Sequence, residues 1–190
     1  MQLLKDRIRR DGITIDNRII KVDNFLNHQL DIRLFNEMGK EFRRLFSDAS
    51  VNKILTVEAS GIGIACITAQ YFDVPVVFAR KTISSNLDVD TYQAPVYSYT
   101  KDTHYTIRVA KQYLNPEDHV LIIDDFLANG NAVCGMLDIV LAAGAKIAGI
   151  GIVIEKSFQG GRKKLEPYNV RIESLAIIDS LFDGKITFAE

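Results

Sequence analysis

The sequence predicts an α/β fold in which a mostly parallel central sheet is flanked by helices. Two observations carry this prediction: apolar, β-branched runs recur along the chain, and segments with helical periodicity lie between them. The runs are apolar at nearly every position, as expected of strands that are covered on both faces. In such sheets, ligands bind at the carboxyl ends of the strands. The five predicted strands are residues 53–57, 74–79, 119–123, 146–154 and 170–178.

Helices are predicted wherever apolar residues recur at spacings of three and four. Two of them precede the sheet, and Asp31 is suited to cap the second. The other two connect strands, which completes the βαβ pattern. The four predicted helices are residues 3–12, 31–47, 61–72 and 130–143.

Two segments do not follow either periodicity. Residues 19–28 are apolar without clean alternation, so we expect a short strand that runs into a loop. Residues 81–105 are polar and aromatic, and loops of this length in compact domains are usually functional. We expect this second segment to form a lid, which could include a hairpin.

Composition narrows the class of protein. The length of 190 residues, with 47% hydrophobic and 25% charged residues, predicts a single domain that spans residues 1–190. The net charge of −1 gives no basic field for nucleic-acid binding. The most apolar stretch, residues 147–154, is far shorter than the roughly 18 residues of a membrane span. Two cysteines without metal-ligand spacing, and no signal-peptide pattern, lead us to expect a cytoplasmic protein.

The strongest motif runs from Val120 to Ala132: an apolar strand, the carboxylates Asp124 and Asp125, a short glycine-containing loop and a helix. Backbone amides at a helix start converge on a phosphate, helped by the helix dipole. Acids alone could be a solvated strand end, but together with the loop they favour phosphate and sugar binding. Successive strand residues point to opposite faces, so we expect the two carboxylates to act in different directions unless the strand has ended.

Two further strand ends suit anions. At the end of the first core strand, Ser60 and Gly61 open a helix, and glycine lets the backbone approach an anion closely. A tight turn is the alternative interpretation. At the end of the second strand, Arg80 and Lys81 would place two cations at the same sheet edge, where they could stabilise a leaving anion. An ordinary solvated charge pair is the alternative there.

Three other residues suit a planar heterocycle. Lys156 ends the long fourth strand and can donate to an exocyclic oxygen of the heterocycle, and Phe158 can cover a ring face. A surface lysine and a core phenylalanine are equally compatible with the spacing. Asn27 precedes the predicted helix at Asp31 and is either a ligand or a turn residue. The three histidines are not at metal-ligand spacing.

The segment VLIIDDFLANGNA resembles the ribose-phosphate signature of the type I phosphoribosyltransferases: four apolar residues, two acids, two apolar residues and Ala-Thr-Gly-Gly-Thr. Its tail here is Ala128-Asn129-Gly130-Asn131-Ala132, which keeps the backbone amides but lacks the threonine hydroxyls. DDFLANG, KVDNFLNHQ, VPVVFARK and IAGIGIVIEKSFQGGR are similar to the bacterial members of the family that act on xanthine. The resemblance covers nearly the whole chain.

This resemblance implies a type I phosphoribosyltransferase fold with a hood (residues 1–30 plus C-terminal elements), a core (about 31–180) and a flexible lid (about 82–105). It also implies a homodimer that transfers ribose 5-phosphate from phosphoribosyl pyrophosphate (PRPP) to xanthine in purine salvage. Mg²⁺ would bind mainly through the substrate diphosphate. No covalent nucleophile is needed, since catalysis orients the base and neutralises the leaving group.

The resemblance also assigns roles to residues. Asp124 and Asp125 are the expected catalytic carboxylates. Ser98 and Tyr99 correspond to lid residues. The expected PRPP-binding residues are Ala128, Asn129, Gly130, Asn131, Ala132, Ser60, Gly61, Arg80 and Lys81. The expected base-binding residues are Ile20, Asn27, Lys156 and Phe158.

Three alternatives stay open. The same machinery serves guanine or hypoxanthine, and only details of the base site separate these enzymes from one that uses xanthine. A non-catalytic PRPP-binding regulator would keep the loop, although regulators of the repressor type add a DNA-binding domain for which 190 residues leave no room. A nucleotide-binding interaction module would show no turnover with any base.

Overall fold

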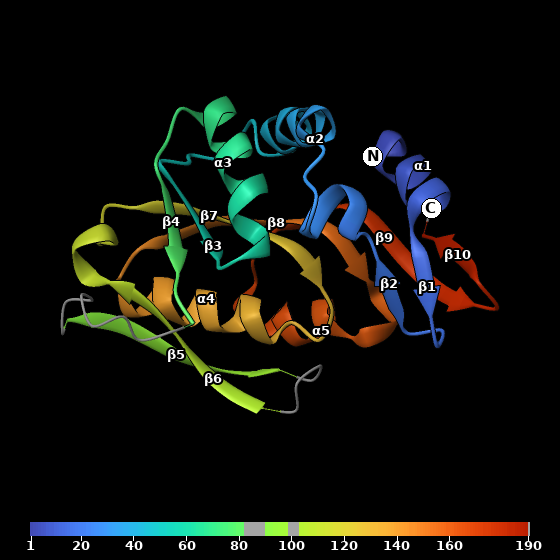
Figure 1. Cartoon of the computed structure of the whole chain (residues 1–190). Coiled ribbons are helices and arrows are strands. Elements are labelled where there is room, and N and C mark those ends of the chain that lie inside the picture. The colour runs from blue at the N-terminus through green and yellow to red at the C-terminus, as the bar shows by residue number, and fades with distance from the viewer. Residues whose placement is uncertain (82–89, 99–102, 190) are drawn as a thin grey trace.

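The computed structural model describes residues 1–81, 90–98 and 103–189. Its centre is a six-stranded sheet in the order β10-β9-β8-β7-β3-β4 (Figure 1). The five strands from β9 to β4 are parallel, and β10 joins the edge antiparallel to β9. These strands are β3 (Lys53–Val57), β4 (Val76–Ala79), β7 (His119–Leu127), β8 (Lys146–Lys156), β9 (Ile172–Phe182) and β10 (Lys185–Phe188). The prediction of a mostly parallel sheet is confirmed.

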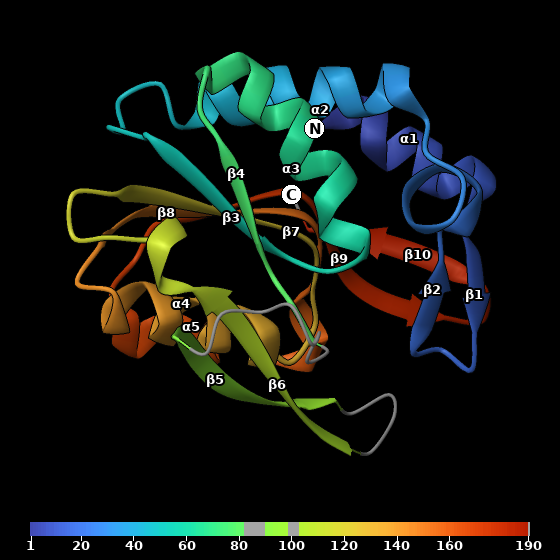
Figure 2. The ribbon, with the colours of Figure 1, turned by 60° about the vertical axis from the view of Figure 1, so that its left-hand side comes forward.

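Helices cover both faces of the sheet (Figures 1 and 2). On one face lie α1 (Gln2–Asp11), α2 (Ile32–Leu45) and α3 (Ser60–Phe72). On the other lie α4 (Asn131–Ala142) and the hairpin of β5 (Thr91–Ser98) and β6 (Thr103–Ala110). Short helices complete the chain: Lys111–Tyr113, Ser157–Gln159, α5 (Gly161–Leu165) and Glu166–Tyr168. A hydrophobic cluster therefore forms on each face of the sheet.

Two aromatic side chains, one in α2 and one directly after it, fix this helix on the sheet. Phe42 and Phe46 are fully buried. The ring of Phe42 occupies the space that a side chain at Gly151 of β8 would need, and the ring of Phe46 does the same at Gly149. The two glycines thus let the rings approach the backbone of the strand. As predicted, Asp31 caps the helix by accepting a hydrogen bond from the backbone N–H of Leu34 at 3.1 Å.

The N-terminal elements pack against the C-terminal strands. The amino group of Met1 donates to the carbonyl of Leu175 in β9 at 2.5 Å, and Nζ of Lys5 donates to the carbonyl of Ala189 at 2.9 Å. Helix α1 is followed by β1 (Ile13–Ile15) and β2 (Ile19–Lys21), which pair as a two-stranded antiparallel sheet. A π-helical turn, Asp23–Asn27, comes next. The two ends of the chain therefore lie in one region of the molecule (Figure 2).

The structure differs from the sequence prediction mainly at element ends. Strand β7 continues to Leu127 and β8 to Lys156, because the backbone ladder persists where polar side chains interrupt the apolar run. Strands β1 and β10 were not predicted, since they are short edge elements. The segment after β2 is a helical turn rather than a loop. Among the described residues, no helix combines the length and apolar character that crossing a membrane requires.

Candidate active site

The two motif carboxylates lie near the end of β7 and are both buried, with exposures of 4% for Asp124 and 8% for Asp125. The backbone N–H of Asp125 donates to Oδ1 of Asp124 at 3.0 Å. Burial raises the pKa of Asp124 well above its usual value, and the negative charge of Asp125 raises it further. The charge of Asp125 thus acts on Asp124. The apolar side chains of β7 do not alternate strictly near its end, because both Ile123 and Phe126 pack on the α2 side.

The turn that opens α3 lies directly against this acidic pair. A side chain at Gly61 would overlap Oγ1 of Thr56 and come within 3.3 Å of Oδ1 of Asp124, so only glycine fits here. Oε1 of Glu58, in the same turn, accepts a hydrogen bond from the backbone N–H of Lys81 at 2.6 Å. The ends of β3, β4 and β7 thus meet, as predicted. Helix α3 begins at Ser60, so the residue beside Asp124 belongs to its first turn.

The two predicted cations, Arg80 and Lys81, have different neighbours. Nζ of Lys81 lies 5.4 Å from the ring centroid of Tyr105, and its positive charge acts to lower the pKa of Asp124, against the larger effect of burial. The guanidinium of Arg80 lies 5.8 Å from the ring centroid of Phe78, an exposed residue of β4. Lys81 is therefore the cation on the side of the carboxylates.

The predicted phosphate loop borders a cavity of about 190 Å³. Gly130 has a positive φ of 77° and immediately precedes α4, so the loop turns sharply into the helix start. A side chain at Gly161 would overlap the carbonyl oxygen of Ala128, which shows that α5 packs on the loop backbone. The cavity is lined by Val96, Tyr97, Tyr105, Phe126, Ala128, Asn129, Gly130, Asn131, Ala132 and Val133.

The side chain of Asn131 joins three elements around this cavity. Its Nδ2 donates to the carbonyl of Tyr97 in β5 at 2.8 Å, and its Oδ1 accepts from Nζ of Lys164 in α5. The amide is thus engaged with protein groups on both sides. The backbone N–H groups at the start of α4 have no intrahelical partner and can face an anion.

The predicted base residue Lys156 ends β8, with Nζ 5.6 Å from the ring centroid of Phe126. Burial of this ammonium lowers the pKa of Lys156. Phe158, in the following short helix, is 42% exposed. The aromatic ring beside Lys156 is therefore Phe126, which the sequence showed only as an apolar position of the motif.

The other two predicted base residues belong to the N-terminal region. Ile20 in β2 is buried in the hydrophobic cluster that includes α1, so little of its side chain is accessible to a ligand. Asn27 ends the π-helical turn and is exposed. Of the two predicted lid residues, Ser98 ends β5 and Tyr99 lies outside the described residues.

Tyr105 is a second residue that the sequence did not single out. It lies in β6, lines the cavity and contacts Lys81. Burial raises the pKa of Tyr105, and the negative charge of Asp124 adds to the effect. Its register opposite Val96, across the hairpin, is the feature that brings it to the phosphate loop.

Comparisons with known proteins agree with this arrangement. The model of the phosphoribosyl transferase domain matches residues 21–181. Xanthine phosphoribosyltransferase of Ruminiclostridium cellulolyticum is 60% identical over the full length of both chains, and that of Clostridium novyi is 58% identical over 99% of each.

Among solved structures, the adenine phosphoribosyltransferase of Giardia lamblia, complexed with 9-deazaadenine, has a TM-score of 0.78. It is 24% identical, with 92% of this chain and 96% of that chain covered. The adenine phosphoribosyltransferase of Rhodothermus marinus gives a TM-score of 0.75 at 22% identity, covering 94% and 100%. These two likenesses establish the type I fold. By its domain match and its full-length relatives, this chain belongs to the phosphoribosyltransferase family.

Proposed function

We propose that the protein is a xanthine phosphoribosyltransferase, a glycosyltransferase of purine salvage. A ring nitrogen of xanthine bonds to C1′ of PRPP while the bond from C1′ to the diphosphate oxygen breaks; diphosphate leaves with the electron pair, and the N–H proton of the imidazole ring is released to solvent. The products are xanthosine 5′-monophosphate and diphosphate. The observation that carries the proposal is the meeting of the α3 turn, Lys81, the buried Asp124–Asp125 pair and the phosphate loop at one sheet edge.

Each part of that edge suits one part of PRPP. The amides of residues 128–132 would hold the 5′-phosphate. Asp124 and Asp125 would bind the ribose hydroxyls and face the positive charge that develops on the sugar. Ser60, Gly61 and Lys81 would bind the diphosphate, and Arg80 stands at the end of the same strand. Since the cavity also borders Tyr105 and Phe126, the ribose would lie between the loop and the base site.

The residues present fit Mg²⁺ that arrives with the substrate. Within residues 1–81, 90–98 and 103–189, no group of three or more His, Cys, Asp or Glu side chains could hold a metal on its own. Mg²⁺ prefers oxygen ligands and keeps substrate phosphates among them, so the diphosphate would supply most ligands beside the Asp124–Asp125 pair. When bound, the ion neutralises charge on the leaving diphosphate.

The base site supports a 6-oxopurine. The Lys156 ammonium only donates hydrogen bonds, so it would pair with O6 and reject the 6-amino group of adenine. Phe126 beside it offers an aromatic face, and Phe158 offers a second, exposed ring. The amide of Asn27 can donate to the 2-oxo group of xanthine, which guanine and hypoxanthine lack. Ile20 would contact the ring from the N-terminal region.

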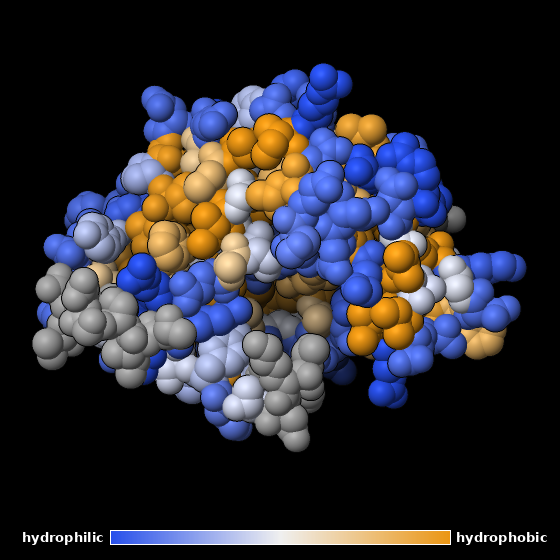
Figure 3. All heavy atoms as spheres, in the orientation of Figure 1, coloured by the Kyte–Doolittle hydropathy of each residue, from blue (hydrophilic) through white to orange (hydrophobic). Residues whose placement is uncertain are grey.

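We also propose a cytoplasmic homodimer. Apolar side chains gather over α3 and β4 on the face shown in Figure 3. Cys66 of α3 and Phe78 of β4 are both exposed. A two-fold symmetric pair is the commonest way to cover such a surface. Both cysteines are free thiols, which suits a reducing compartment. Light scattering of the purified protein would measure the mass of the assembly.

One assay separates the candidate functions. Diphosphate release is measured with PRPP, Mg²⁺ and each of xanthine, guanine, hypoxanthine, adenine, uracil and orotate. We expect the highest kcat/KM with xanthine and the lowest among the purines with adenine. A higher value with guanine or hypoxanthine would replace xanthine as the substrate. Release with none of the six bases, together with PRPP binding by calorimetry, would identify a non-catalytic PRPP-binding protein instead.

A further inference from the structure

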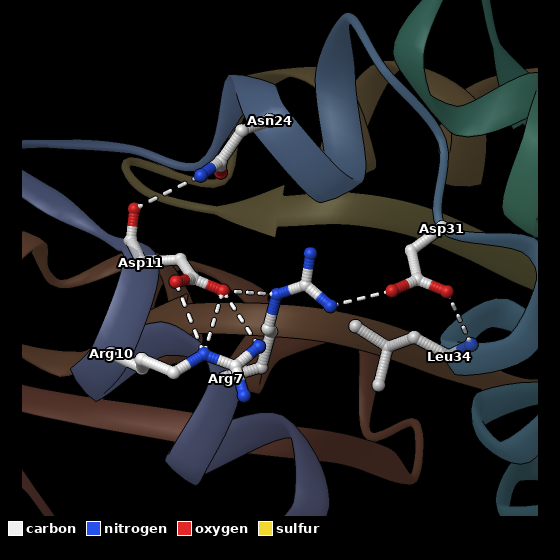
Figure 4. A network of polar contacts seen from close by, with 6 residues as sticks. All are labelled: Arg7, Arg10, Asp11, Asn24, Asp31 and Leu34. Atoms are coloured by element: carbon white, nitrogen blue, oxygen red, sulfur yellow. Dashed lines mark hydrogen bonds and ion pairs between the residues drawn. The ribbon is translucent and has the colours of Figure 1, made fainter.

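Arg7 of α1 connects three elements of the N-terminal region (Figure 4). Its Nη1 donates to Oδ2 of Asp31 at 2.5 Å, and its Nε forms an ion pair with Oδ2 of Asp11 at 2.5 Å. The guanidinium also stacks on Phe25, 5.0 Å from the ring centroid. Its side chain is 23% exposed, so this is not an ordinary solvated ion pair.

Two of the residues that Arg7 contacts, Phe25 and Asp31, are the first and last residues of one short segment. Phe25 is fully buried in the π-helical turn, and Asp31 is the cap of α2. The backbone between them closes on itself, since the N–H of Asp31 donates to the carbonyl of Phe25 at 3.0 Å. The N–H of Gln29 likewise donates to the carbonyl of Asp23 at 2.8 Å. Asn27, the candidate base-reading residue, lies within this closed loop.

The chemistry of arginine suits this position. A planar guanidinium can donate to a carboxylate in its plane while one face stacks on an aromatic ring, and lysine cannot do both. Asp31 also accepts from the Leu34 N–H, so the loop end is fixed from both sides. The loop that carries Asn27 is therefore attached to α1 through Arg7 and to α2 through Asp31.

We propose that Arg7 is a positioning residue for base selection, which holds the loop of residues 25–31 so that Asn27 reads the C2 substituent of the purine. The inference rests on the proposed function, in which Asn27 donates to the 2-oxo group. Groups that orient a ligand-binding side chain affect binding strongly without touching the ligand. A purely structural role for Arg7 would affect folding and all substrates alike.

The test compares Arg7→Met with Arg10→Met. Arg10 lies on the same helix and binds the same Asp11, through Nη2 at 2.8 Å, but its side chain is 69% exposed. We expect Arg7→Met to lower the ratio of kcat/KM for xanthine over guanine about tenfold, mainly through KM for xanthine. KM for PRPP should stay within about twofold, and Arg10→Met should match the wild type. An unchanged ratio in a folded Arg7→Met variant would overturn the inference.

Two further variants keep the test decisive. Asp31→Asn retains a helix cap but weakens the contact with Arg7, so it should lower the same ratio even if Arg7→Met does not fold. Adding Arg7→Met to Asn27→Ala should lower the ratio no further than Asn27→Ala alone, because both act on one contact. Additive losses, or equal losses for all bases and for PRPP, would overturn the inference. If Asn27→Ala itself leaves the ratio unchanged, the base-site assignment fails, and this inference fails with it.

Discussion

The ribose-phosphate half and the base half of the proposed site are assembled in different ways. The first comes largely from one continuous stretch, with Asp124 and Asp125 near the end of β7 and residues 128–132 leading into the first turn of α4. The second combines the end of β8 with β2 and the π-helical turn, more than 100 residues away in the sequence. A contiguous half can be inherited as one motif, whereas a dispersed half can vary with the elements that carry it. Chemistry and base selection should therefore respond separately to mutation, and four predictions address that separation.

Removal of divalent cations should have the largest effect, because in the proposed reaction Mg²⁺ neutralises the leaving diphosphate and is held mainly by it, the described residues offering no metal-binding group of three or more side chains. We expect diphosphate release to disappear in a chelator and to return on addition of excess Mg²⁺. Measurement with both xanthine and guanine should show equal losses, since the ion belongs to the ribose-phosphate half. Full activity in chelator would contradict the prediction.

Replacing the buried carboxylates should come next. Asp125→Asn and Asp124→Asn should each lower kcat/KM for PRPP by about a hundredfold, since charge that faces the transition state is lost. The ratio between xanthine and guanine should not change. Steady-state kinetics and thermal unfolding measure both effects.

Asp118→Asn is the matched control for these carboxylates. Asp118 is also buried, but it pairs with Nζ of Lys53 at 2.7 Å near the start of β7. This variant should lower Tm and leave turnover per folded molecule intact. If Asp118→Asn reduces turnover as much as Asp125→Asn, the ribose role of the motif acids is wrong.

Lys156→Ala tests the base half of the proposed site alone. Loss of a charged donor should lower kcat/KM about tenfold to a hundredfold for all 6-oxopurines together. KM for PRPP should stay near that of the wild type, as measured with saturating base. A loss confined to xanthine would show that Lys156 reads C2 rather than O6.

Asn131 should give the smallest effect. Asn131→Ala removes the two hydrogen bonds that tie the loop to Tyr97 and Lys164. Since these bonds hold the loop without touching the phosphate, we expect an increase of only about threefold to tenfold in KM for PRPP. Lys164→Met should act similarly, and its exposed neighbour Lys163 provides the control variant Lys163→Met. A loss of about a hundredfold or more in Asn131→Ala would indicate that this amide holds the phosphate directly and would contradict main-chain binding.

The same contrast explains how far sequence reasoning reached. The sheet, its helices and the loop of residues 128–132 were predictable, because apolar periodicity and a glycine before a helix are local signals. The end of β7 was set too early, since periodicity stops at Asp124 although the backbone pairing with β8 continues.

Residues whose role depends on tertiary contacts could not be identified from the sequence. Phe126 reads as one more apolar position, and only its place beside Lys156 gives it meaning. Tyr105 reaches the cavity through the hairpin register, and Arg7 reaches Asp31 across 24 positions. No periodic pattern encodes such pairings, because charge and aromatic contacts between distant elements leave no spacing to detect. The resemblance to known phosphoribosyltransferases supplied Ile20 and Asn27 for the same reason.

The close packing at Gly61 has a consequence for how this family can evolve. Oγ1 of the fully buried Thr56 occupies the volume that any side chain at position 61 would need, and Asp124 stands on the same side. A lineage could accept alanine at position 61 only after position 56 had lost its branched side chain. The reverse order would pass through a poorly folded intermediate. Positions 56 and 61 should therefore drift as a pair, with the smaller residue at 56 appearing first.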